Sequence, residues 1–424
     1  MRKNRIMCAE YDVIVCGAGP AGICAALQAA RCGAKTALIE KNGICGGALT
    51  LSNINMPGVF NAWGKQIIAG IGWELLVKTW NVTGSPLPDL SRPEFSYAQP
   101  NVNRLVFASV VDDAMADAGV DVRFHTMIAS ARFETDIWHL QLCEKDGLVS
   151  VTGSMVIDCT GDANVSYMAG FPCKQTESPQ PGTLSMYFHN FDPAALDFED
   201  LNRRFNNAVE SGEVLAEDMG WHRPSFFFDH GRNSNHITGF NAADSRGKTK
   251  MEIAGRRSLM RMLRFIRSCP GLENAEFRMS SAECGIRETR QIIGEYTITE
   301  DDYLNGKRYA DGICNAFYPI DIHTDKGLFR KHLEKGVVPS VPLRALIPQN
   351  SKNFLVAGRC LSADRPAFSA LRVQAPCMAM GQAAGAAAVL AHNCQCDVRD
   401  IPLDKLRSLL QCHGAILPEL PCKH

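Results

Sequence analysis

Hydrophobic and polar residues near the start of the chain follow the pattern of a strand, a helix and a second strand. Residues 11–16 (YDVIVC) form an apolar, β-branched run with the length of a buried parallel strand. An alanine-rich stretch from Pro20 to Cys32 predicts a helix, because proline is favoured in a first helical turn and Gly33 is a good C-terminal stop. Residues 35–40 (KTALIE) predict the second strand, which completes a β-α-β unit.

Later segments predict further strands and helices. Proline-bearing loops fill residues 50–100, and helices are predicted near 63–79 and 103–118. Residues 120–160 predict a meander of strands through VDVRFHTMI, WHLQLCE and VSVTGSMVIDCT, with a turn at Asp146-Gly147. Near the end of the chain, NFLVA predicts a strand and an alanine-rich stretch at 376–392 predicts a helix.

The composition changes after Gly170, where the sequence becomes polar and rich in loops. A strand-like SMYFHNF and a basic helix at 248–268 lie in this region, and a β-α pattern then returns. We therefore predict an α/β protein in which one domain is split between residues 1–170 and 345–424. An α+β domain is inserted at residues 171–344.

Gly-Ala-Gly-Pro-Ala-Gly lies between the first strand and the first helix, and this placement is typical of a dinucleotide-binding turn. Gly17 permits the tight turn, Gly19 lets the backbone approach a pyrophosphate, and Gly22 lets the helix pack closely. The helix N-terminus offers free N–H groups to phosphates. Glu40 ends the second strand about 20 residues on, where an acidic side chain binds ribose hydroxyls. The predicted contacts here are Gly17, Ala18, Gly19, Pro20, Ala21, Gly22, Glu40 and Lys41.

Three features favour FAD over NAD as the dinucleotide. The motif lies close to the start of the chain, at residues 17–22. Gly46-Gly47 follow Glu40 where the backbone would pass a second phosphate or a ribityl chain. Thr160-Gly161-Asp162 ends a later strand and could bring a carboxylate to the cofactor. A second glycine motif for NAD(P)H is missing, because Gly381 to Gly385 lie inside a predicted helix; transient use of NAD(P)H stays open.

Several stretches together resemble one known family. They are VIVCGAGPAG, EKNGICGG, VIDCTGDA, AECGIRETRQIIGEYTITEDDY, YPIDIH and NFLVAGRCLSADRPAFSALRVQAPCMAMGQAAGAAA, spanning residues 11 to about 390. They are similar to FAD-dependent oxidoreductases of the glutathione reductase-like flavoprotein superfamily. The resemblance implies an FAD-binding Rossmann-like domain of three layers (ββα). It also implies that the inserted domain binds the substrate.

The resemblance also implies further cofactor contacts. Gly358-Arg359 and the following helix, which carries Gly381, would close over the flavin. Ile128 would contact the adenine through its backbone. The chain departs from the family pattern at Leu343-Arg344, where relatives often have Tyr-Arg, and at residues 363–366, where a histidine is common. If that histidine touches substrate in relatives, the substrate of this chain differs.

A flavin carries the redox step, so the protein must supply positioning and proton transfer. His323 is the first candidate base, because histidine titrates near neutral pH. Asp321 lies two residues earlier in a predicted strand, so both side chains share a face and the carboxylate can hold the imidazole tautomer. Two surface residues of a strand would show the same pattern.

Arginines are the candidate anion-binding residues. Arg287 and Arg290 are three residues apart, which places them on one side of a helix, where they could bind a carboxylate or support developing negative charge. Structural ion pairs with Glu283 or Glu288 explain these arginines equally well. Arg344 and Arg372 are weaker candidates of the same kind.

The composition excludes several classes of function. With 44 Lys and Arg against 45 Asp and Glu, the net charge of −1 provides no field to attract nucleic acid or an anionic membrane. No run approaches the ~20 apolar residues of a membrane span. We therefore expect a cytoplasmic protein. We expect no metal site, because the 17 cysteines include no C-x-x-C pair. Cys45 has no nearby partner, so thiol–disulfide chemistry is not expected.

The leading hypothesis is an FAD-dependent oxidoreductase that transfers a hydride between flavin and a small polar substrate, such as a hydroxylated sugar derivative or a hydroxy acid. A flavin-dependent reductase of a carboxylate-conjugated C=C bond is an alternative that suits the arginine pair. A non-catalytic FAD-binding or electron-transfer protein is another. The charge balance disfavours a flavin-dependent modifier of RNA. The oligomeric state stays open, a homo-oligomer included.

Overall fold

The predicted β-α-β unit forms the centre of the main sheet. In the computed structural model, strand β1 (Tyr11–Cys16) is followed by helix α1 (Pro20–Arg31) and strand β2 (Thr36–Ile39), and the two strands pair in parallel. The structure describes residues 10–91, 100–220, 223–224, 232–279, 281–324 and 327–421. Every residue of β2 is buried, as expected for a strand covered on both faces.

The main sheet has seven strands in the order β5-β2-β1-β8-β7-β6, and β18 also pairs with β8. Strand β5 (Asp121–Arg123) pairs in parallel with β2. The end of β8 (Gly147–Asp158) pairs in parallel with β1 on one side and with β18 (Phe354–Val356) on the other. The meander continues antiparallel through β7 (Ile137–Glu144) and β6 (Met127–Glu134). Because β18 comes almost 200 residues after β8, separate segments of the chain assemble this sheet.

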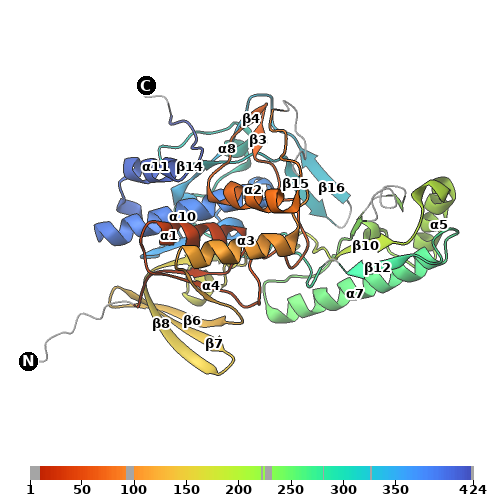
Figure 1. The fold of residues 1–424 in the computed structure, drawn as a ribbon, viewed down its shortest axis with the longest axis horizontal. Coiled ribbons are helices and arrows are strands. Elements are labelled where there is room, and N and C mark those ends of the chain that lie inside the picture. The colour runs from red at the N-terminus through yellow and green to blue at the C-terminus, as the bar shows by residue number, and fades with distance from the viewer. Residues whose placement is uncertain are drawn as a thin grey trace, which may run out of the picture.

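Helices pack together on one side of the main sheet, and the strands of the meander extend from its other side (Figure 1). Helix α1 packs against α10 (Gln374–Cys394), and α2 (Ile71–Thr83) and α3 (Arg104–Asp117) lie beside them. The contact is close because it uses small residues: a Cβ on Gly381 would lie 2.0 Å from the carbonyl oxygen of Ala21. The predicted α/β fold with a parallel, Rossmann-like sheet is confirmed.

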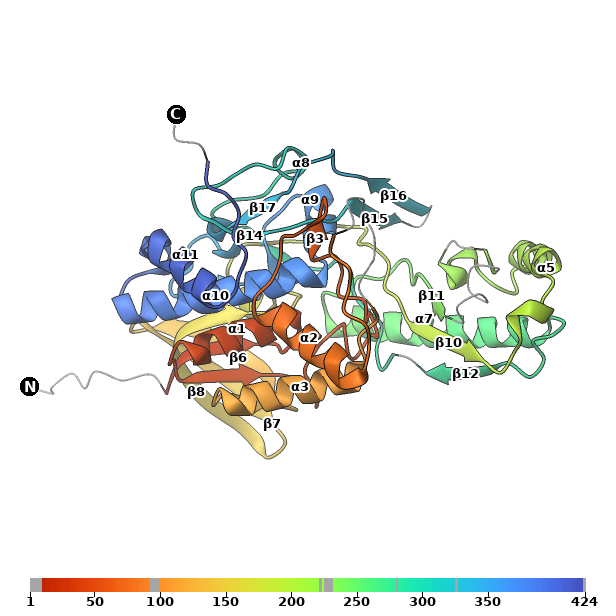
Figure 2. The same cartoon turned by 45° about the horizontal axis from the view of Figure 1, so that its top comes forward.

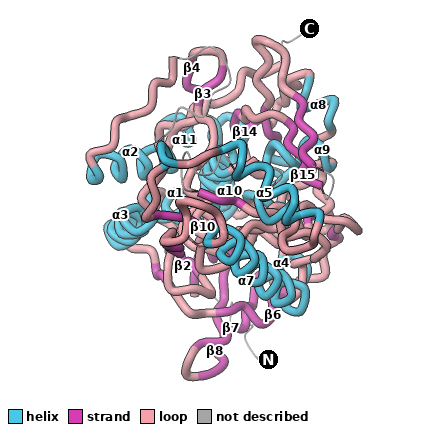
Figure 3. The backbone as a smooth tube through the Cα atoms, turned by 90° about the vertical axis from the view of Figure 1, so that its right-hand side faces the viewer, coloured by secondary structure: helices cyan, strands magenta, loops and turns pink. Residues whose placement is uncertain are grey.

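The described residues between 185 and 279 form a lobe that projects from the main body (Figure 2). Strands β10 (Ser185–His189), β11 (Arg232–Ser234) and β12 (Glu276–Met279) make an antiparallel sheet. Helices α5 (Phe198–Glu210) and α7 (Ser245–Arg267) bury a separate apolar core with it, and Figure 3 views the molecule from this side. The basic helix predicted at 248–268 is α7.

The chain then returns to the main body. The hairpin of β15 (Ile320–Thr324) and β16 (Gly327–Lys331) and the pair of β14 (Gly312–Asn315) and β17 (Ser340–Pro342) follow. Residues such as Ile292 and Leu343 are buried in the apolar core of the main body, together with the main sheet, although they fall inside the range predicted as the inserted domain. The boundaries at 171 and 344 stay a prediction.

The remaining elements are short. They are β3 (Asn61–Ala62), β4 (Lys65–Gln66), β9 (Cys173–Lys174), β13 (Gln291–Ile292), α4 (Asn164–Met168), α8 (Glu300–Leu304), α9 (Arg365–Leu371), α11 (Leu403–Cys412) and the 3₁₀ turns Pro193–Ala195, Ala216–Met219, Leu343–Leu346, Gly358–Cys360 and Val398–Asp400. Among the described residues, no single helix has the length and apolar composition to cross a membrane; α9 and α10 reach that threshold only together, with a bend of 88° between them.

Two local predictions were wrong. The helix predicted at 63–79 begins only at Ile71, because Trp63 and Gly64 take positive φ angles and turn a hairpin between β3 and β4. The helix predicted through Arg287 and Arg290 does not form. There the backbone of Gly285 pairs with Thr183 through two hydrogen bonds of 2.7 and 2.9 Å, which holds this segment extended.

Candidate functional site

The glycine motif forms the turn between β1 and α1. Gly17 has a φ of +98°, which side chains rarely adopt, and a Cβ on it would lie 2.7 Å from the carbonyl oxygen of Cys159. A Cβ on Gly22 would lie 1.8 Å from the carbonyl oxygen of Gly17. Gly19 differs from both, because a Cβ there would have no atom within 4 Å. Two of the glycines therefore serve the fold, and the third leaves open space above the turn.

The N-terminus of α1 suits a phosphate group. Its N-cap residue is Gly19, so no side chain caps the first N–H groups of the helix, and Pro20 follows. No acidic residue lies in the first turn. The unsatisfied N–H groups and the positive end of the helix dipole therefore remain available to an anion beside the open space at Gly19.

Glu40 places a carboxylate beside the same turn. Its Oε2 accepts a 2.8 Å hydrogen bond from the backbone N–H of Ala18, and its Oε1 accepts from the backbone and side-chain nitrogens of Asn42 at 2.9 and 2.8 Å. Glu40 is buried, whereas the adjacent Lys41 is exposed. These bonds hold the carboxylate at the end of β2, where ribose hydroxyls bind in dinucleotide folds.

The glycine pair after Glu40 also approaches the turn. The backbone N–H of Gly46 donates to the carbonyl of Ala18 at 2.8 Å, and its φ is +113°. A Cβ on Gly47 would lie 3.0 Å from the Cα of Gly19. This second backbone segment therefore passes close to the N-terminus of α1, and its contact with FAD stays a prediction.

Thr160-Gly161-Asp162 joins the site to the C-terminal part of the chain. The buried carboxylate of Asp158 accepts hydrogen bonds from the backbone and hydroxyl groups of Thr160 and Ser166, which sets this turn. Arg359, which follows β18, forms a 2.8 Å ion pair with Asp162. A Cβ on Gly161 would lie 2.9 Å from the same guanidinium. Two predicted cofactor segments almost 200 residues apart are therefore in contact.

The other predicted cofactor residues are Gly358, Gly381 and Ile128. Gly358 has a φ of +80°, and a Cβ there would lie 3.0 Å from that of Ala21. Gly381 of α10 packs against the backbone of Ala21 of α1, so it lies in the contact between these two helices. Ile128 lies in β6 beside an irregularity of the ladder, and its adenine contact stays a prediction. The uncapped helix, the open space at Gly19 and the buried carboxylate fit FAD.

His323 and Asp321 lie together on β15, as their spacing predicts. Nε2 of His323 is 2.9 Å from Oδ2 of Asp321. Nδ1 of His323 is 2.9 Å from Nε2 of His236, a buried residue of the lobe that the sequence analysis did not identify. The backbone N–H of His323 donates to Oε1 of Gln180 at 3.2 Å, and Arg330 donates to Oδ1 of Asp321 at 3.1 Å.

The surroundings of this pair set its protonation. Burial and the charge of Arg287 lower the pKa of His323 to about 4, although the hydrogen bond to Asp321 opposes them. Burial alone would raise the pKa of Asp321, but its bond to His323 and the charges of Arg372 and Arg330 hold that pKa below its ordinary value. At neutral pH a neutral imidazole therefore lies beside a carboxylate. Its Nε2–H donates to Asp321, so its Nδ1 is an acceptor.

Arg287 and Arg372 lie beside this pair. Nη1 of Arg287 donates to the carbonyl of Pro181 and the hydroxyl of Thr183, both at 2.7 Å. Burial and the charge of Arg372 lower the pKa of Arg287 to about 9. Nη2 of Arg372 lies 3.4 Å from both Oε1 of Gln180 and the carbonyl of Asp321. Arg287 and Arg372 therefore contact the adjacent residues Pro181 and Gln180, and Gln180 also accepts from the backbone of His323.

Arg290 and Arg344 lie in other surroundings. Arg290 is buried and donates to the carbonyls of Asp162 and Ala243 and to the side chain of Asn164, so it ties three segments together. The shared helix face expected for Arg287 and Arg290 is absent. Arg344 forms two hydrogen bonds of 3.0 and 3.2 Å with Asp311 and is half exposed. The acidic residues suggested as partners of Arg287 and Arg290 form ion pairs elsewhere, Glu288 with Arg365 and Glu283 with Lys248.

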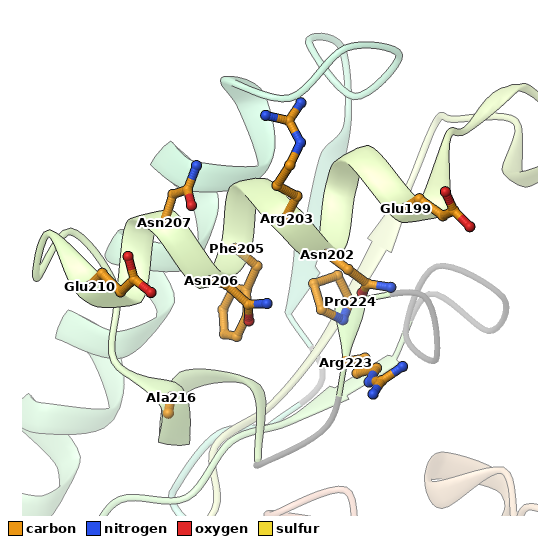
Figure 4. A pocket seen from close by; sticks show the side chains of 10 residues that line it. All are labelled: Glu199, Asn202, Arg203, Phe205, Asn206, Asn207, Glu210, Ala216, Arg223 and Pro224. Carbon is orange, nitrogen blue, oxygen red and sulfur yellow. The ribbon is translucent and has the colours of Figure 1, made fainter.

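A surface pocket of about 750 Å³ lies on α5, far from the glycine turn (Figures 1 and 4). Glu199, Arg203, Asn206 and Glu210 of that helix line it, together with residues such as Arg223. None of the predicted site residues lines this pocket. Across the part of the chain that the structure describes, no three His, Cys, Asp or Glu side chains converge to hold a metal ion.

Comparisons with known proteins point to one family. The model of the family described as FAD dependent oxidoreductase matches residues 12–410. Dihydrolipoyl dehydrogenase from Acholeplasma laidlawii is 41% identical over 71 residues, which cover 15% of this chain and 21% of that protein. The match thus spans about a fifth of that relative's length.

Solved structures match this chain at low similarity. OxyS anhydrotetracycline hydroxylase from Streptomyces rimosus is 12% identical, with a TM-score of 0.45, over 95% of this chain and 66% of that chain. A flavoprotein/dehydrogenase from Cytophaga hutchinsonii is 14% identical, with a TM-score of 0.43, over 95% of this chain and 82% of that chain. Values this low carry no argument about the substrate.

Proposed function

Because the chain belongs to the FAD dependent oxidoreductase family, we propose that it is an enzyme that transfers a hydride between FAD and a small polar substrate beside His323. The observation that carries this proposal is the hydrogen-bonded chain from His236 through His323 to Asp321, with distances of 2.9 Å at both steps. A neutral imidazole that is oriented by a carboxylate is a general base. Residues 171–344 act as the substrate domain in this proposal, because they supply all three side chains.

The glycine turn and Glu40 would hold the cofactor. The N–H groups at the start of α1 would bind the pyrophosphate, and the carboxylate of Glu40 would bind the ribose hydroxyls. FAD, when bound, accepts or donates the hydride. The backbone of Gly46-Gly47 and the Arg359–Asp162 ion pair would line its remaining length.

His323 would handle the proton. Oxidation of a C–H bond next to a hydroxyl requires that the hydroxyl proton leave, and Nδ1 of His323 is the atom of that ring able to accept it. The carboxylate of Asp321 would stabilise the resulting imidazolium. His236 faces the same nitrogen and, in this tautomer, donates its Nε2–H to it, so His236 would turn aside when the substrate hydroxyl takes its place.

Anaerobic visible spectroscopy of the purified protein tests the proposal. Sugars, hydroxy acids and amino acids are added in turn, and bleaching of the flavin band identifies a hydride donor. The variant His323→Gln should keep the flavin but bleach far more slowly with the same compound. A colourless protein that cannot be reconstituted with FAD would contradict the proposal.

A second candidate function is reduction of a C=C bond conjugated to a carboxylate. Arg287 and Arg372 favour it, because they contact the neighbouring residues Pro181 and Gln180, and two guanidinium groups can hold a carboxylate and draw electron density from the double bond. In the same experiment, a flavin that no compound bleaches, but that is reduced by dithionite and reoxidised by an enoate, would favour this reaction.

A further inference from the structure

Gln180 presents a buried donor without an acceptor beside His323. Its Oε1 accepts from the backbone N–H of His323 and faces Nη2 of Arg372 at 3.4 Å. Since both neighbours of this oxygen are donors, turning the amide over would place donors against donors. The side-chain nitrogen of Gln180 is therefore the atom left over, and it has no partner among the described residues. Burying such a group without an acceptor is unfavourable.

Arg372 has the same deficit. Its side chain is 13% exposed, and its Nε is buried without a hydrogen-bond partner among the residues that the structure describes. Its nearest carboxylate oxygen, Oδ2 of Asp321, lies 3.9 Å from Nη2. That carboxylate already accepts from His323 and Arg330, so it satisfies Arg372 poorly.

Arg287 completes the group. Both of its hydrogen bonds to described residues come from Nη1, and both go to neutral acceptors. No described carboxylate lies within ion-pair distance of it. Its side chain is partly buried, so it keeps a surface that a ligand can cover. A mostly buried guanidinium that lacks an anionic partner is costly to the fold.

The other charges near this group are already paired. Glu288 forms an ion pair with Arg365 and accepts hydrogen bonds from the hydroxyl of Thr176 and the backbone N–H of Gln180. Asp162 is paired with Arg359. The local excess therefore consists of two guanidinium groups, and the unused donors of Gln180 and Arg372 add to it. A ligand that satisfies them must be anionic and must accept hydrogen bonds.

We propose that Gln180, Arg287 and Arg372, called here the donor cluster, bind the carboxylate group of the substrate. The proposal rests on the proposed function, because His323 places the cluster beside the proton acceptor. A carboxylate donates nothing and accepts at two oxygens, which match the planar forks of two guanidinium groups. It deepens the proposed function by naming the substrate class as small carboxylates, a hydroxy acid for oxidation or an enoate for reduction.

The test measures binding rather than turnover. The purified holoprotein is titrated in its oxidised state with pairs of acid and amide that share a skeleton, such as glycolate with glycolamide, lactate with lactamide, and acrylate with acrylamide. Binding is followed by calorimetry and by the shift of the flavin spectrum. We expect at least one acid to bind about tenfold or more tightly than its amide. If no acid in the set does so, the proposal is overturned.

Variants assign this binding to the cluster. Arg372→Met should bring the acid down to the affinity of its amide. Arg256→Met, which removes an arginine that is 61% exposed on α7, should leave the difference unchanged. Equal losses in both variants would point to a general charge effect and overturn the proposal.

Gln180→Glu is a variant that should stabilise the protein while it blocks the site. It places a resident carboxylate of the same shape beside the two arginines, so it should raise the melting temperature and abolish binding of the acid. Binding of the acid by Gln180→Glu as in the unmodified protein would overturn the proposal. So would inorganic phosphate that displaces the acid at equal or lower concentration, because the cluster would then be a phosphate site.

The outcomes separate this inference from the proposed function. A neutral sugar that bleaches the flavin, while no acid binds, would leave hydride transfer standing and remove the carboxylate site. An acid that binds through the cluster, while no compound exchanges electrons with the flavin, would leave the carboxylate site standing and remove hydride transfer.

Discussion

Nδ1 of His323 lies 2.9 Å from Nε2 of His236, although 87 residues separate them in the chain. His323 belongs to the hairpin of β15 and β16, and His236 follows β11 in the lobe. The contact between these imidazoles therefore spans the lobe and the main body. A proton acceptor built in this way depends on how the lobe is placed, which the order of residues in the sequence does not reveal.

Replacing His323 tests its role as the proton acceptor. His323→Gln keeps a polar side chain of similar reach but removes the basic nitrogen, so kcat should fall by about 10²–10⁴-fold. The FAD content should not change, since His323 is not among the residues placed at the glycine turn. His189→Gln, on an exposed position of β10, is the matched control and should retain full activity. A His323→Gln enzyme with normal kcat would exclude this residue as the base.

The pH dependence follows from the lowered pKa of His323. Burial and Arg287 bring this pKa to about 4, so kcat/KM should stay level well below pH 6.5 and fall only as the pH approaches 4. Asp321→Asn should move this fall to still lower pH, because the hydrogen bond and charge of Asp321 raise the pKa of His323. A fall centred near 6.5, with normal FAD content, would show that His323 is not the group observed.

Stability should depend on the same group. Between pH 6.5 and about 4, the unfolded chain binds a proton at His323 that the folded chain does not bind, so the free energy of unfolding should decrease as the pH falls through this range. The contribution is fully present above pH 6.5. Denaturant unfolding at several pH values, with and without His323→Gln, measures it. A variant with an unchanged pH dependence in this window would contradict the assignment.

Two glycines of the turn should respond differently to alanine. Gly19→Ala adds a methyl group in open space at a φ of −72°, so the protein without cofactor should be as stable as before while FAD binds at least about tenfold more weakly. Gly22→Ala places the methyl group 1.8 Å from the carbonyl oxygen of Gly17 and should destabilise the protein with or without FAD. Thermal melting and FAD titration of both variants make the comparison. Normal FAD affinity in Gly19→Ala would contradict a pyrophosphate at this turn.

Much of the fold could be predicted because its patterns are local. The first β-α-β unit, the meander and helix α10 each carry their periodicity and end signals within a short stretch. The dinucleotide turn is equally local, since Gly17 and Gly22 meet each other across five residues. Asp321 and His323 are two residues apart in one strand, so their contact needed only the alternation of side chains.

The rest of the site depends on contacts between distant segments. Gln180, His236 and Arg372 meet His323 or its partners only after the lobe and α9 take their places. No motif marks His236, and a single histidine in a polar loop carries no pattern. The spacing of Arg287 and Arg290 predicted a helix, but hydrogen bonds between Gly285 and Thr183 hold that segment extended. Long-range strand pairing therefore overrode the local pattern.

The separate placement of Arg287 and Arg290 leads to the last prediction. Arg290→Met would leave the carbonyls of Asp162 and Ala243 and the side chain of Asn164 without their charged donor, so the free energy of unfolding should fall by about 2–4 kcal/mol. Arg287→Met removes a guanidinium whose described hydrogen bonds reach only neutral acceptors, and it should cost less stability. Urea unfolding of both variants, followed by far-UV circular dichroism, gives the comparison. If Arg290→Met unfolds at the same urea concentration as the unmodified protein but loses binding of small carboxylates, the two arginines would act together on the ligand after all, and Arg290 would belong to the donor cluster.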